Sequence, residues 1–329
     1  MNADPNQVLR NAVAAAVMAP SSYNTQPWRF RIVGGTTLEL RADPARQLRG
    51  IDRDGRQLVQ SCGCALYNAR VAVRAMGFTD EVSVMLVSEA AHPELLATLH
   101  LGPMRIPTDE DHTAIRALAA RHTNRRPFLP VPVADVAPLV AAAAREGAWA
   151  VRIAPPQKQV LGALIEEADR LQYADPAFRA DLERWLASVG SRRRDGIPFV
   201  EKEYGSAMPF GVMRALRSPS LGDRVGQLEE EMVEGAPVVL VLGTDSDEPP
   251  AWLASGQALE AVLLAATGME LEAAFLNQVL EVPALRAEVG ALVGRTGYPQ
   301  VVLRLGYASE PLRHPAPRRE LDEVLEIAS

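Results

Sequence analysis

The sequence predicts an α+β fold in two halves, and three observations lead to that prediction. The chain has 329 residues, which is long for one ordinary domain and suits two closely packed ones. Short stretches that alternate between apolar and polar residues, as strands do, stand next to longer stretches with the apolar spacing of helices. The second half repeats this plan loosely: Gly63-Cys-Ala-Leu and Gly256-Gln-Ala-Leu each precede a helical stretch that ends in glycine.

The first half is assigned to residues 1–110 and the second to residues 111–329. The chain is expected to open with a helix, because Asp4 is a favourable N-cap and Pro5 a favourable first helical residue. That helix stops before Pro20. The elements expected after it are a hairpin with strands at 28–33 and 37–40, a helix at 56–76 ended by Gly77, and a strand at 82–87.

The second half is expected to begin with a helix that starts at Asp111 and carries the basic stretch 121–128, where Pro127 ends or kinks it. The further elements expected are a strand at 149–153, a helix after Pro176, a strand at 237–242, a helix at 252–267 ended by Gly268, and a strand at 299–305. Residues 188–219 interrupt the pattern with glycine, proline and aromatic residues. Long insertions of this kind are functional lids or disordered surface loops, and we predict a lid.

Composition excludes several classes of function. The chain carries 34 basic and 41 acidic residues, a net charge of −7, which argues against nonspecific binding of nucleic acid or of anionic membranes. No apolar run approaches eighteen residues, so no membrane span is expected. The N-terminus lacks the basic region of a signal peptide, and the cytoplasm is the expected location.

The cysteines and histidines predict neither a metal site nor a catalytic side chain. Cys62 and Cys64 are too close for an easy disulfide and lack the second pair that a zinc site needs, so both are expected to pack as small hydrophobic residues in a helix. The five histidines are scattered along the chain. No dinucleotide-binding, P-loop, zinc-protease or hydrolase motif is present.

The stretch Arg121-His-Thr-Asn-Arg-Arg-Pro-Phe128 concentrates three guanidinium groups, a hydroxyl, an amide and an imidazole. Guanidinium groups form bidentate, charge-assisted hydrogen bonds that match phosphate. On a helical turn Arg121 and Arg125 would share a face and could converge on one anion. The alternative interpretation is a solvated basic helix end.

A second polar stretch, Pro20-Ser-Ser-Tyr-Asn-Thr-Gln-Pro-Trp-Arg-Phe30, lies far upstream. Its hydroxyl and amide side chains offer hydrogen-bond donors and acceptors, although Pro-Ser-Ser and Asn also favour turns in any protein. Trp28 and Phe30 alternate along the expected strand and are predicted to be core residues.

Together the two stretches resemble the FMN-binding nitroreductase superfamily. In that family an Arg-x-Ser-x-Arg segment holds the flavin phosphate, and a Pro-Ser-x-x-Asn-x-Gln-Pro-Trp-x-Phe segment lines the flavin from the partner subunit. Arg121, Thr123 and Arg125 match the first segment, with Thr in place of Ser. The segments lie about a hundred residues apart and in reverse order, so the chain is similar to the Acg-type branch, in which two nitroreductase-like halves are fused.

The resemblance implies an α+β nitroreductase-like fold, an internal pseudo-dimer, with one FMN bound between the halves. Two more stretches carry over: a basic pair near the C-terminus that lies beside the phosphate, and a stretch that passes the flavin edge. A basic tail exposed to solvent is the alternative for that pair. The implied cofactor-binding residues are Pro20, Ser21, Ser22, Asn24, Gln26, Arg121, Thr123, Arg125, Phe275, Asn277, Arg318 and Arg319.

The function that the resemblance implies is the NAD(P)H-dependent reduction of nitroaromatic or quinone-type acceptors. The flavin carries the hydride chemistry, so no catalytic side chain is required. One alternative is a flavin-binding or flavin-sequestering protein of the Acg type without turnover. Another is a protein-interaction module whose arginine clusters meet acidic partners. The chain is expected to act as a monomer, because its two halves form the interface that family enzymes form between subunits.

Overall fold

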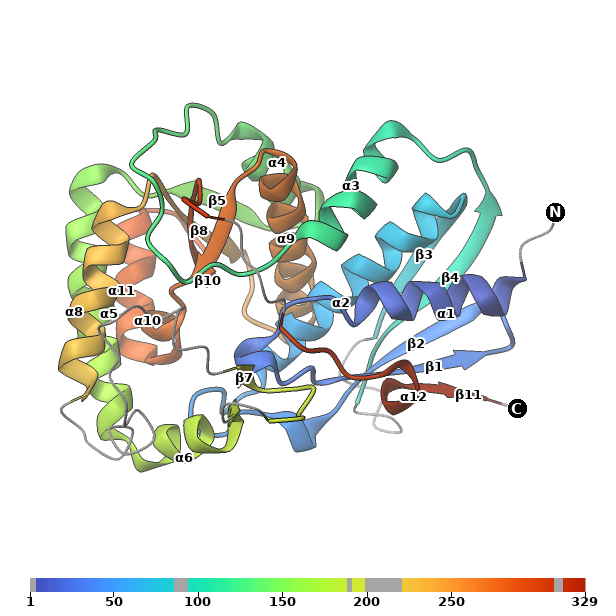
Figure 1. The fold of residues 1–329 in the computed structure, drawn as a ribbon, viewed down its shortest axis with the longest axis horizontal. Coiled ribbons are helices and arrows are strands. Elements are labelled where there is room, and N and C mark those ends of the chain that lie inside the picture. Colours follow the sequence, from blue (N-terminus) through green and yellow to red (C-terminus); the bar gives the residue numbers. More distant parts are fainter. Residues whose placement is uncertain (1–3, 86–93, 188–190, 199–220, 311–315, 329) are drawn as a thin grey trace.

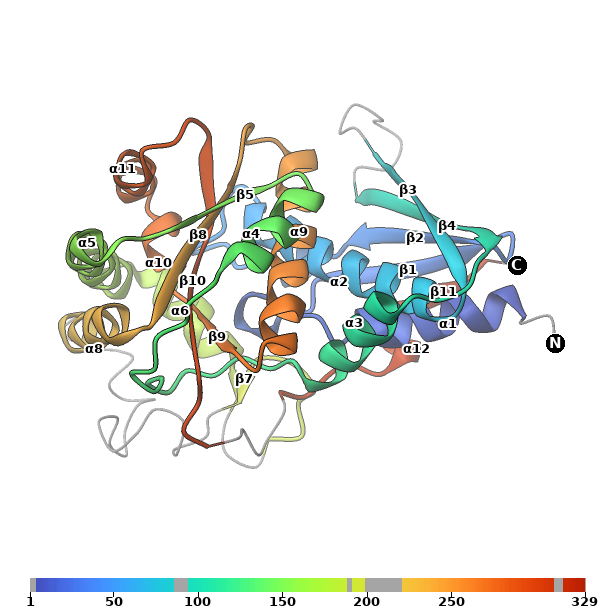
Figure 2. The same ribbon diagram turned by 90° about the horizontal axis from the view of Figure 1, so that it is seen from above.

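The computed structural model describes residues 4–85, 94–187, 191–198, 221–310 and 316–328 (Figure 1). Most of the segment predicted to be a lid, 188–219, lies outside these ranges. None of the helices described has the length and apolar character needed to cross a membrane. The α+β architecture predicted from the sequence is confirmed, with two main sheets and helices packed between and around them (Figures 1 and 2).

The first sheet has the strand order β11-β1-β2-β4-β3. Its antiparallel strands are β1 (Trp28–Val33), β2 (Thr37–Ala42), β3 (Phe78–Val84) and β4 (Leu95–Met104). Strand β11 (Leu325–Ile327), from the C-terminal end, pairs in parallel with β1. Burial alternates along β1 and β2, so one face of this sheet packs on the core and the other is more open.

The second sheet has the order β5-β8-β10-β9, and all its pairs are antiparallel. Its strands are β5 (Trp149–Arg152), β8 (Val238–Thr244), β9 (Glu272–Phe275) and β10 (Tyr298–Gly306). Every residue of β8 is buried, as is every residue of β10 after Tyr298. Leu240 and Val239, adjacent on β8, belong to two different hydrophobic clusters, so the sheet is covered on both faces.

Two long helices, α2 (Arg56–Ala75) and α9 (Pro249–Gly268), pack against each other between the sheets (Figure 2). They touch at Gly63 and Gly256. A Cβ atom on Gly256 would lie 2.0 Å from the Gln60 carbonyl oxygen, and one on Gly63 would lie 2.3 Å from the Leu253 carbonyl oxygen. Such close approach of two backbones requires glycine at both positions.

The remaining helices surround this centre. Helix α1 packs on α2, and α3 packs on α2 and α9. In Figure 2, α5, α8 and α11 lie on the far side of the second sheet from α4 and α9. Their bounds are α1 (Pro5–Ala16), α3 (Asp109–Ala120), α4 (Ala137–Arg145), α5 (Pro155–Ala174), α6 (Pro176–Trp185), α8 (Leu221–Gly235), α10 (Gln278–Glu281), α11 (Pro283–Val293) and α12 (Leu321–Val324). The short elements are the 3-10 turns η1 (Ser22–Asn24) and η2 (Pro44–Arg46) and the parallel pair β6 (Leu186–Ala187) and β7 (Ile197–Pro198).

Several local predictions are confirmed. The Asp4 side chain caps α1 and Pro5 begins it. The predicted hairpin is β1 and β2, and Trp28 and Phe30 are core residues. Cys62 and Cys64 are buried, free thiols within α2, as expected of small hydrophobic residues.

The prediction of a helix through residues 121–128 is wrong. Helix α3 ends at Ala120, and Arg121 already has extended backbone angles, φ −61° and ψ 130°. The chain then runs beside β9: Thr123 forms a parallel bridge with Ala273, and the Asn124 amide donates to the Ala273 carbonyl at 2.9 Å. This pairing favours an extended backbone over a helix, so Arg121 and Arg125 do not share a helical face.

Two helix and strand limits also differ from the prediction. Helix α9 begins at Pro249, and Gly268 is its last residue rather than its stop signal; the left-handed residue beyond it is Glu270, with φ 61°. Strand β3 begins at Phe78, directly after Gly77 with φ 85°, and not at residue 82. In both cases the pairing or packing of a whole element extends it beyond the local apolar pattern.

Candidate functional site

The carbonyl oxygen of Met18 is the point where three distant stretches of sequence meet. Nη2 of Arg121 donates to it at 3.3 Å, and Nη2 of Arg318 donates to it at 3.1 Å. Met18 immediately precedes the Ala19-Pro20 start of the polar motif. The folded chain therefore brings the first motif, the basic stretch and the C-terminal basic pair to one place.

A buried carboxyl group lies beside these two arginines. Glu260 on α9 is 0% exposed, and its Oε1 lies 3.6 Å from Nε of Arg121. Burial raises the pKa of Glu260 to about 7, against the opposing effect of Arg121. Burial also lowers the pKa of Arg318 to about 10, and the charge of Arg121 adds to that effect.

Several guanidinium N–H groups at this place are buried and have no hydrogen-bond acceptor within the described ranges. They are Nε and Nη1 of Arg121, Nε of Arg318 and Nε of Arg319. Buried donors in proteins are nearly always paired. Arg121 and Arg318, which meet at the Met18 carbonyl, are suited to an anion with several oxygens, such as a phosphate ester. The guanidinium of Arg319 instead donates to the carbonyl oxygens of Gln26 and Glu323. The residues present therefore fit the phosphate end of a flavin mononucleotide.

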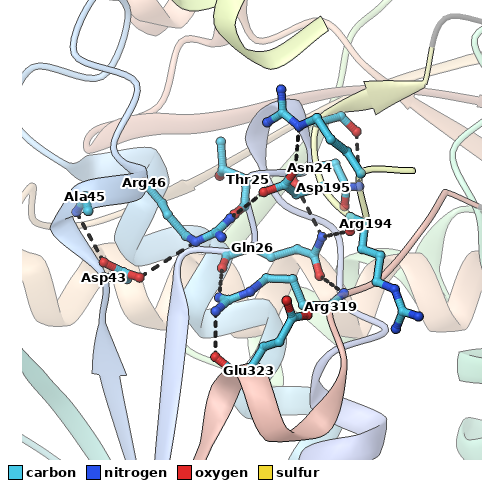
Figure 3. Close-up of polar contacts among 12 residues, drawn as sticks. Asn24, Thr25, Gln26, Asp43, Ala45, Arg46, Arg194, Asp195, Arg319 and Glu323 are labelled. Carbon is cyan, nitrogen blue, oxygen red and sulfur yellow. Dashed lines mark hydrogen bonds and ion pairs between the residues drawn. The ribbon is translucent and has the colours of Figure 1, made fainter. Parts of the chain in front are cut away.

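Gln26 connects the first motif to two other segments (Figure 3). Its side chain is 0% exposed; Nε2 donates to the Arg194 carbonyl at 2.7 Å, and Oε1 accepts from the Arg319 amide at 2.8 Å. The backbone amide of Gln26 donates to Oγ of Ser21 at 2.9 Å. The side-chain amide of Gln26 is thus bonded within the protein, where it fixes the positions of Arg194 and Arg319.

The loop that holds Ser21 to Gln26 has an unusual backbone. Tyr23, Asn24 and Gln26 all have φ near +50°, in the left-handed region that side-chain-bearing residues seldom adopt. Each such residue costs roughly 1–3 kcal/mol and persists only where the surrounding structure imposes it. Here Nδ2 of Asn24 donates to the carbonyl oxygens of Gly196 and Pro317, both at 3.1 Å. Contacts from far along the chain thus impose the shape of this loop.

Sequence reasoning missed four charged residues of this site, three of which support the loop. Nη1 of Arg46 donates to the Thr25 carbonyl at 2.8 Å and to Oδ2 of Asp195 at 2.9 Å, and Asp43 also lies against Arg46 (Figure 3). No local pattern marks these three residues. Glu260, the fourth, did carry a signal: it is the only charged residue in the 20-residue helix α9.

Ser22 opens a second polar connection, toward α10. Its hydroxyl donates to Oε1 of Gln57 at 2.5 Å, and Nε2 of Gln57 donates to Oε1 of Glu281 at 2.6 Å. Gln172 of α5 donates to the other oxygen of Glu281 at 2.5 Å. Burial raises the pKa of Glu281, although these two amide donors oppose the change. This chain of bonds joins the first motif to helices α5 and α10.

The other predicted site residues lie along the second sheet. Phe275 is in β9, opposite Leu303 of β10, and Oδ1 of Asn277 accepts from the Val302 amide at 2.9 Å. The Arg125 carbonyl accepts from Nη2 of Arg304 at 2.8 Å. The guanidinium of Arg125 faces Glu229 of α8, whose pKa is raised by burial and lowered in part by Arg304 and Arg125.

Comparison with known proteins identifies the family. The chain is 35% identical over 327 residues to "Putative NAD(P)H nitroreductase Rv3131" of Mycobacterium tuberculosis (strain ATCC 25618 / H37Rv), covering 97% of this chain and 91% of that protein. It is 32% identical over 335 residues to "Putative NAD(P)H nitroreductase acg" of the same strain, covering 97% and 96%. The chain belongs to the nitroreductase superfamily. The resemblance noted in the sequence is therefore confirmed.

Comparison with family models and with solved structures gave two further results. No family model matches it. A solved structure, the FMN- and NADPH-dependent nitroreductase NfnB from a Sphingopyxis strain, is 25% identical and aligns with a TM-score of 0.40 over 66% of this chain and 99% of that one. Within the described part of the chain, no group of three His, Cys, Asp or Glu residues could hold a metal ion.

Proposed function

We propose that the protein binds FMN and uses it to pass reducing equivalents from NAD(P)H to a nitroaromatic or quinone-type acceptor. The observation that carries this proposal is the convergence of Arg121 and Arg318 on the Met18 carbonyl, with buried guanidinium donors that have no acceptor among the residues that the structure describes. Membership of the nitroreductase superfamily supports the same conclusion. When bound, a flavin supplies the hydride chemistry, and the protein supplies binding and orientation.

The roles proposed for the side chains follow from their places. Arg121 and Arg318 would hold the phosphate, with Thr123 and Arg125 beside them, whereas Arg319 donates to the carbonyl oxygens of Gln26 and Glu323 and would support the loop. The loop from Pro20 to Gln26 would provide Ser21 and Ser22 to the polar parts of the flavin, while Asn24 and Gln26 fix the loop itself. Phe275 and Asn277 would lie toward the edge of the ring.

We also propose that the chain is an internal pseudo-dimer, divided near residues 110 and 111, and that it acts as a monomer. The two sheets support this by their strand orders, β1-β2-β4-β3 and β5-β8-β10-β9. Helices α2 and α9 occupy equivalent positions in those orders and cross at Gly63 and Gly256. Light scattering of the flavin-loaded protein should give one chain and one flavin per particle. An obligate dimer with flavin between subunits would contradict this.

The decisive experiment is an absorption spectrum of the purified protein after incubation with FMN and desalting, with riboflavin as the matched ligand. Retention of FMN at about one per chain, and poor retention of riboflavin, is the expected result, because charged hydrogen bonds to phosphate contribute roughly 1.5–3 kcal/mol each. Anaerobic addition of NADPH should then bleach the visible band. Bound FMN that is not bleached by NADPH or NADH would indicate flavin storage instead of turnover.

A further inference from the structure

Glu260 is an unexpected neighbour for a phosphate site. It is fully buried on α9, and within the described ranges neither of its oxygens has a hydrogen-bond donor that meets ordinary geometry. Arg121 approaches it from the end of α3, and Arg318 faces it from the C-terminal segment. From α2, the buried side chains of Asn68 and Cys64 face it. Burial raises the pKa of the Cys64 thiol, with Glu260 adding to the effect, so this thiol stays neutral.

The charges of Arg121, Arg318 and Glu260 determine what can bind beside them. Two guanidinium groups and one carboxylate leave a single net positive charge in a buried place. A phosphate ester of charge about −2 at pH 7 would turn that into a net negative charge. Uncompensated buried charge is strongly unfavourable, and buried groups commonly change protonation state to avoid it. Protonation of Glu260 would restore neutrality.

We propose that Glu260 is the charge-matching residue of this subsite: it is the counter-ion that positions Arg121 and Arg318, and it takes up one proton when a phosphate dianion binds to them. The inference rests on the proposed binding of FMN; it assigns Glu260 a role in that binding and predicts that one proton is taken up with the ligand. The geometry supports it because Glu260 and the phosphate would share the same guanidinium groups. A pKa of about 7 for Glu260 makes the proton available near neutrality.

The sign of the pH dependence follows from this exchange. Below pH 7 most of Glu260 is already protonated, so FMN should bind with little proton uptake. Above pH 7 it is mostly a carboxylate, and uptake should approach one proton per FMN. When one proton is taken up on binding, the Kd for FMN rises about tenfold for each unit by which the pH increases. The phosphate itself, with a second pKa of about 6, contributes little in that range.

Isothermal titration of the full chain with FMN, in two buffers of different ionisation enthalpy, measures the uptake directly. Uptake should rise from about half a proton per FMN at pH 7 to nearly one at pH 8.5, and none is expected for riboflavin, which has the same ring and no phosphate. The riboflavin comparison needs no variant. Binding of FMN without proton uptake, or equal uptake for riboflavin, would overturn the role of Glu260 and leave FMN binding intact.

The variant Glu260→Gln supplies the second measurement. It should bind FMN without proton uptake, with a Kd independent of pH between 7 and 8.5 and up to about tenfold lower than that of the unaltered protein at pH 8. A Glu260→Gln protein that still takes up a proton would refute the proposal. Failure of the unaltered protein to bind FMN at any pH would remove the proposed function itself, and this inference with it.

Discussion

The two sheets of the molecule share a strand order but not an environment. Strands β1-β2-β4-β3 and β5-β8-β10-β9 follow the same plan, and the second strand of each order is followed by a 20-residue helix, α2 or α9, whose eighth residue is glycine. The first sheet has one open face with Arg29 and Arg31 on it, whereas the second is buried on both faces. The same topology can thus serve as an outer layer or as an inner one, and the residues on the second face decide which.

The two sheets also receive segments from distant parts of the chain. The C-terminal strand β11 pairs with β1 of the first sheet, and both chain ends lie beside that sheet (Figure 1). The segment after α3, by contrast, lies against the second sheet: Asn124 bonds Ala273, and the Leu129 amide donates to the Tyr307 carbonyl at 2.8 Å. The C-terminal end of the chain returns to the first sheet, which explains why residues from both ends of the sequence meet at Met18.

The largest expected effect tests the difference in burial. Val302 of β10 lies in the cluster on the second face and is fully buried, so Val302→Asn should lower the free energy of unfolding by about 3–4 kcal/mol. Arg31→Asn, on the open face of β1, should change it by less than about 0.5 kcal/mol. Urea unfolding followed by circular dichroism measures both. Similar losses for the two variants would show that the faces do not differ as described.

The next effect tests the contact between α2 and α9. Gly256→Ala would place a methyl group against the Gln60 carbonyl, and Gly63→Ala would do the same against Leu253, so each should cost about 2–3 kcal/mol. The control is Gly268→Ala in the same helix, where nothing lies within 4 Å of the added atom. It should be neutral or stabilising. Unequal losses for the two crossing glycines would weaken the equivalence of the halves.

A third prediction asks which half holds the phosphate. The guanidinium of Arg121 bonds Met18 of the first half, whereas that of Arg125 faces Glu229 of the second. Arg121→Ala should weaken FMN binding by about 1.5–3 kcal/mol, or roughly 10- to 150-fold, and leave riboflavin binding unchanged. Arg125→Ala should have a smaller effect. Fluorescence titration with FMN measures both affinities. A greater loss of affinity for Arg125→Ala than for Arg121→Ala would indicate that the phosphate binds nearer to α8.

The smallest effect concerns the segment after α3, which runs beside β9. His122 Nε2 lies 3.1 Å from Oε1 of Glu272 on β9, and this contact raises the pKa of His122. Burial would raise the pKa of Glu272, but His122 and Asn124 outweigh it and lower that pKa. The contact should therefore stabilise the fold at pH values between the pKa of Glu272 and the pKa of His122. Its contribution is lost as pH rises through the His122 value, above 6.5, or falls through the Glu272 value, below 4.5.

Thermal unfolding at pH 6 and pH 8.5 tests this prediction in the protein and in Glu272→Gln. The difference in free energy of unfolding between the two proteins should be no more than about 1 kcal/mol, because the pair is partly exposed. It should be present mainly at pH 6, where His122 is charged. The variant keeps an amide that can bond Asn124, so loss of the charge is isolated. A difference between the proteins that is the same at both pH values would contradict the assignment of the charge to His122.

The sequence by itself determined the local elements and the family. The alternation of Trp28, Arg29, Phe30 and Arg31 places one set of side chains in the core and the other outside, because successive residues of a strand face opposite sides. Asp4 and Pro5 begin α1 by capping and by restricting φ, which involve only neighbouring residues. The two polar motifs were readable for the same reason: their chemistry lies in contiguous residues.

Only the tertiary structure decided where those motifs meet and what lies between them. Helix α3 ends at Ala120 because Thr123 and Asn124 pair with β9, about 150 residues further along the chain. Arg46 and Asp195 support the motif loop across a similar separation, and Glu260 reaches Arg121 from a helix that is otherwise uncharged. The role of a buried charged residue depends on the groups that surround it in the folded chain. Tertiary packing determines those neighbours, and no local sequence pattern specifies them.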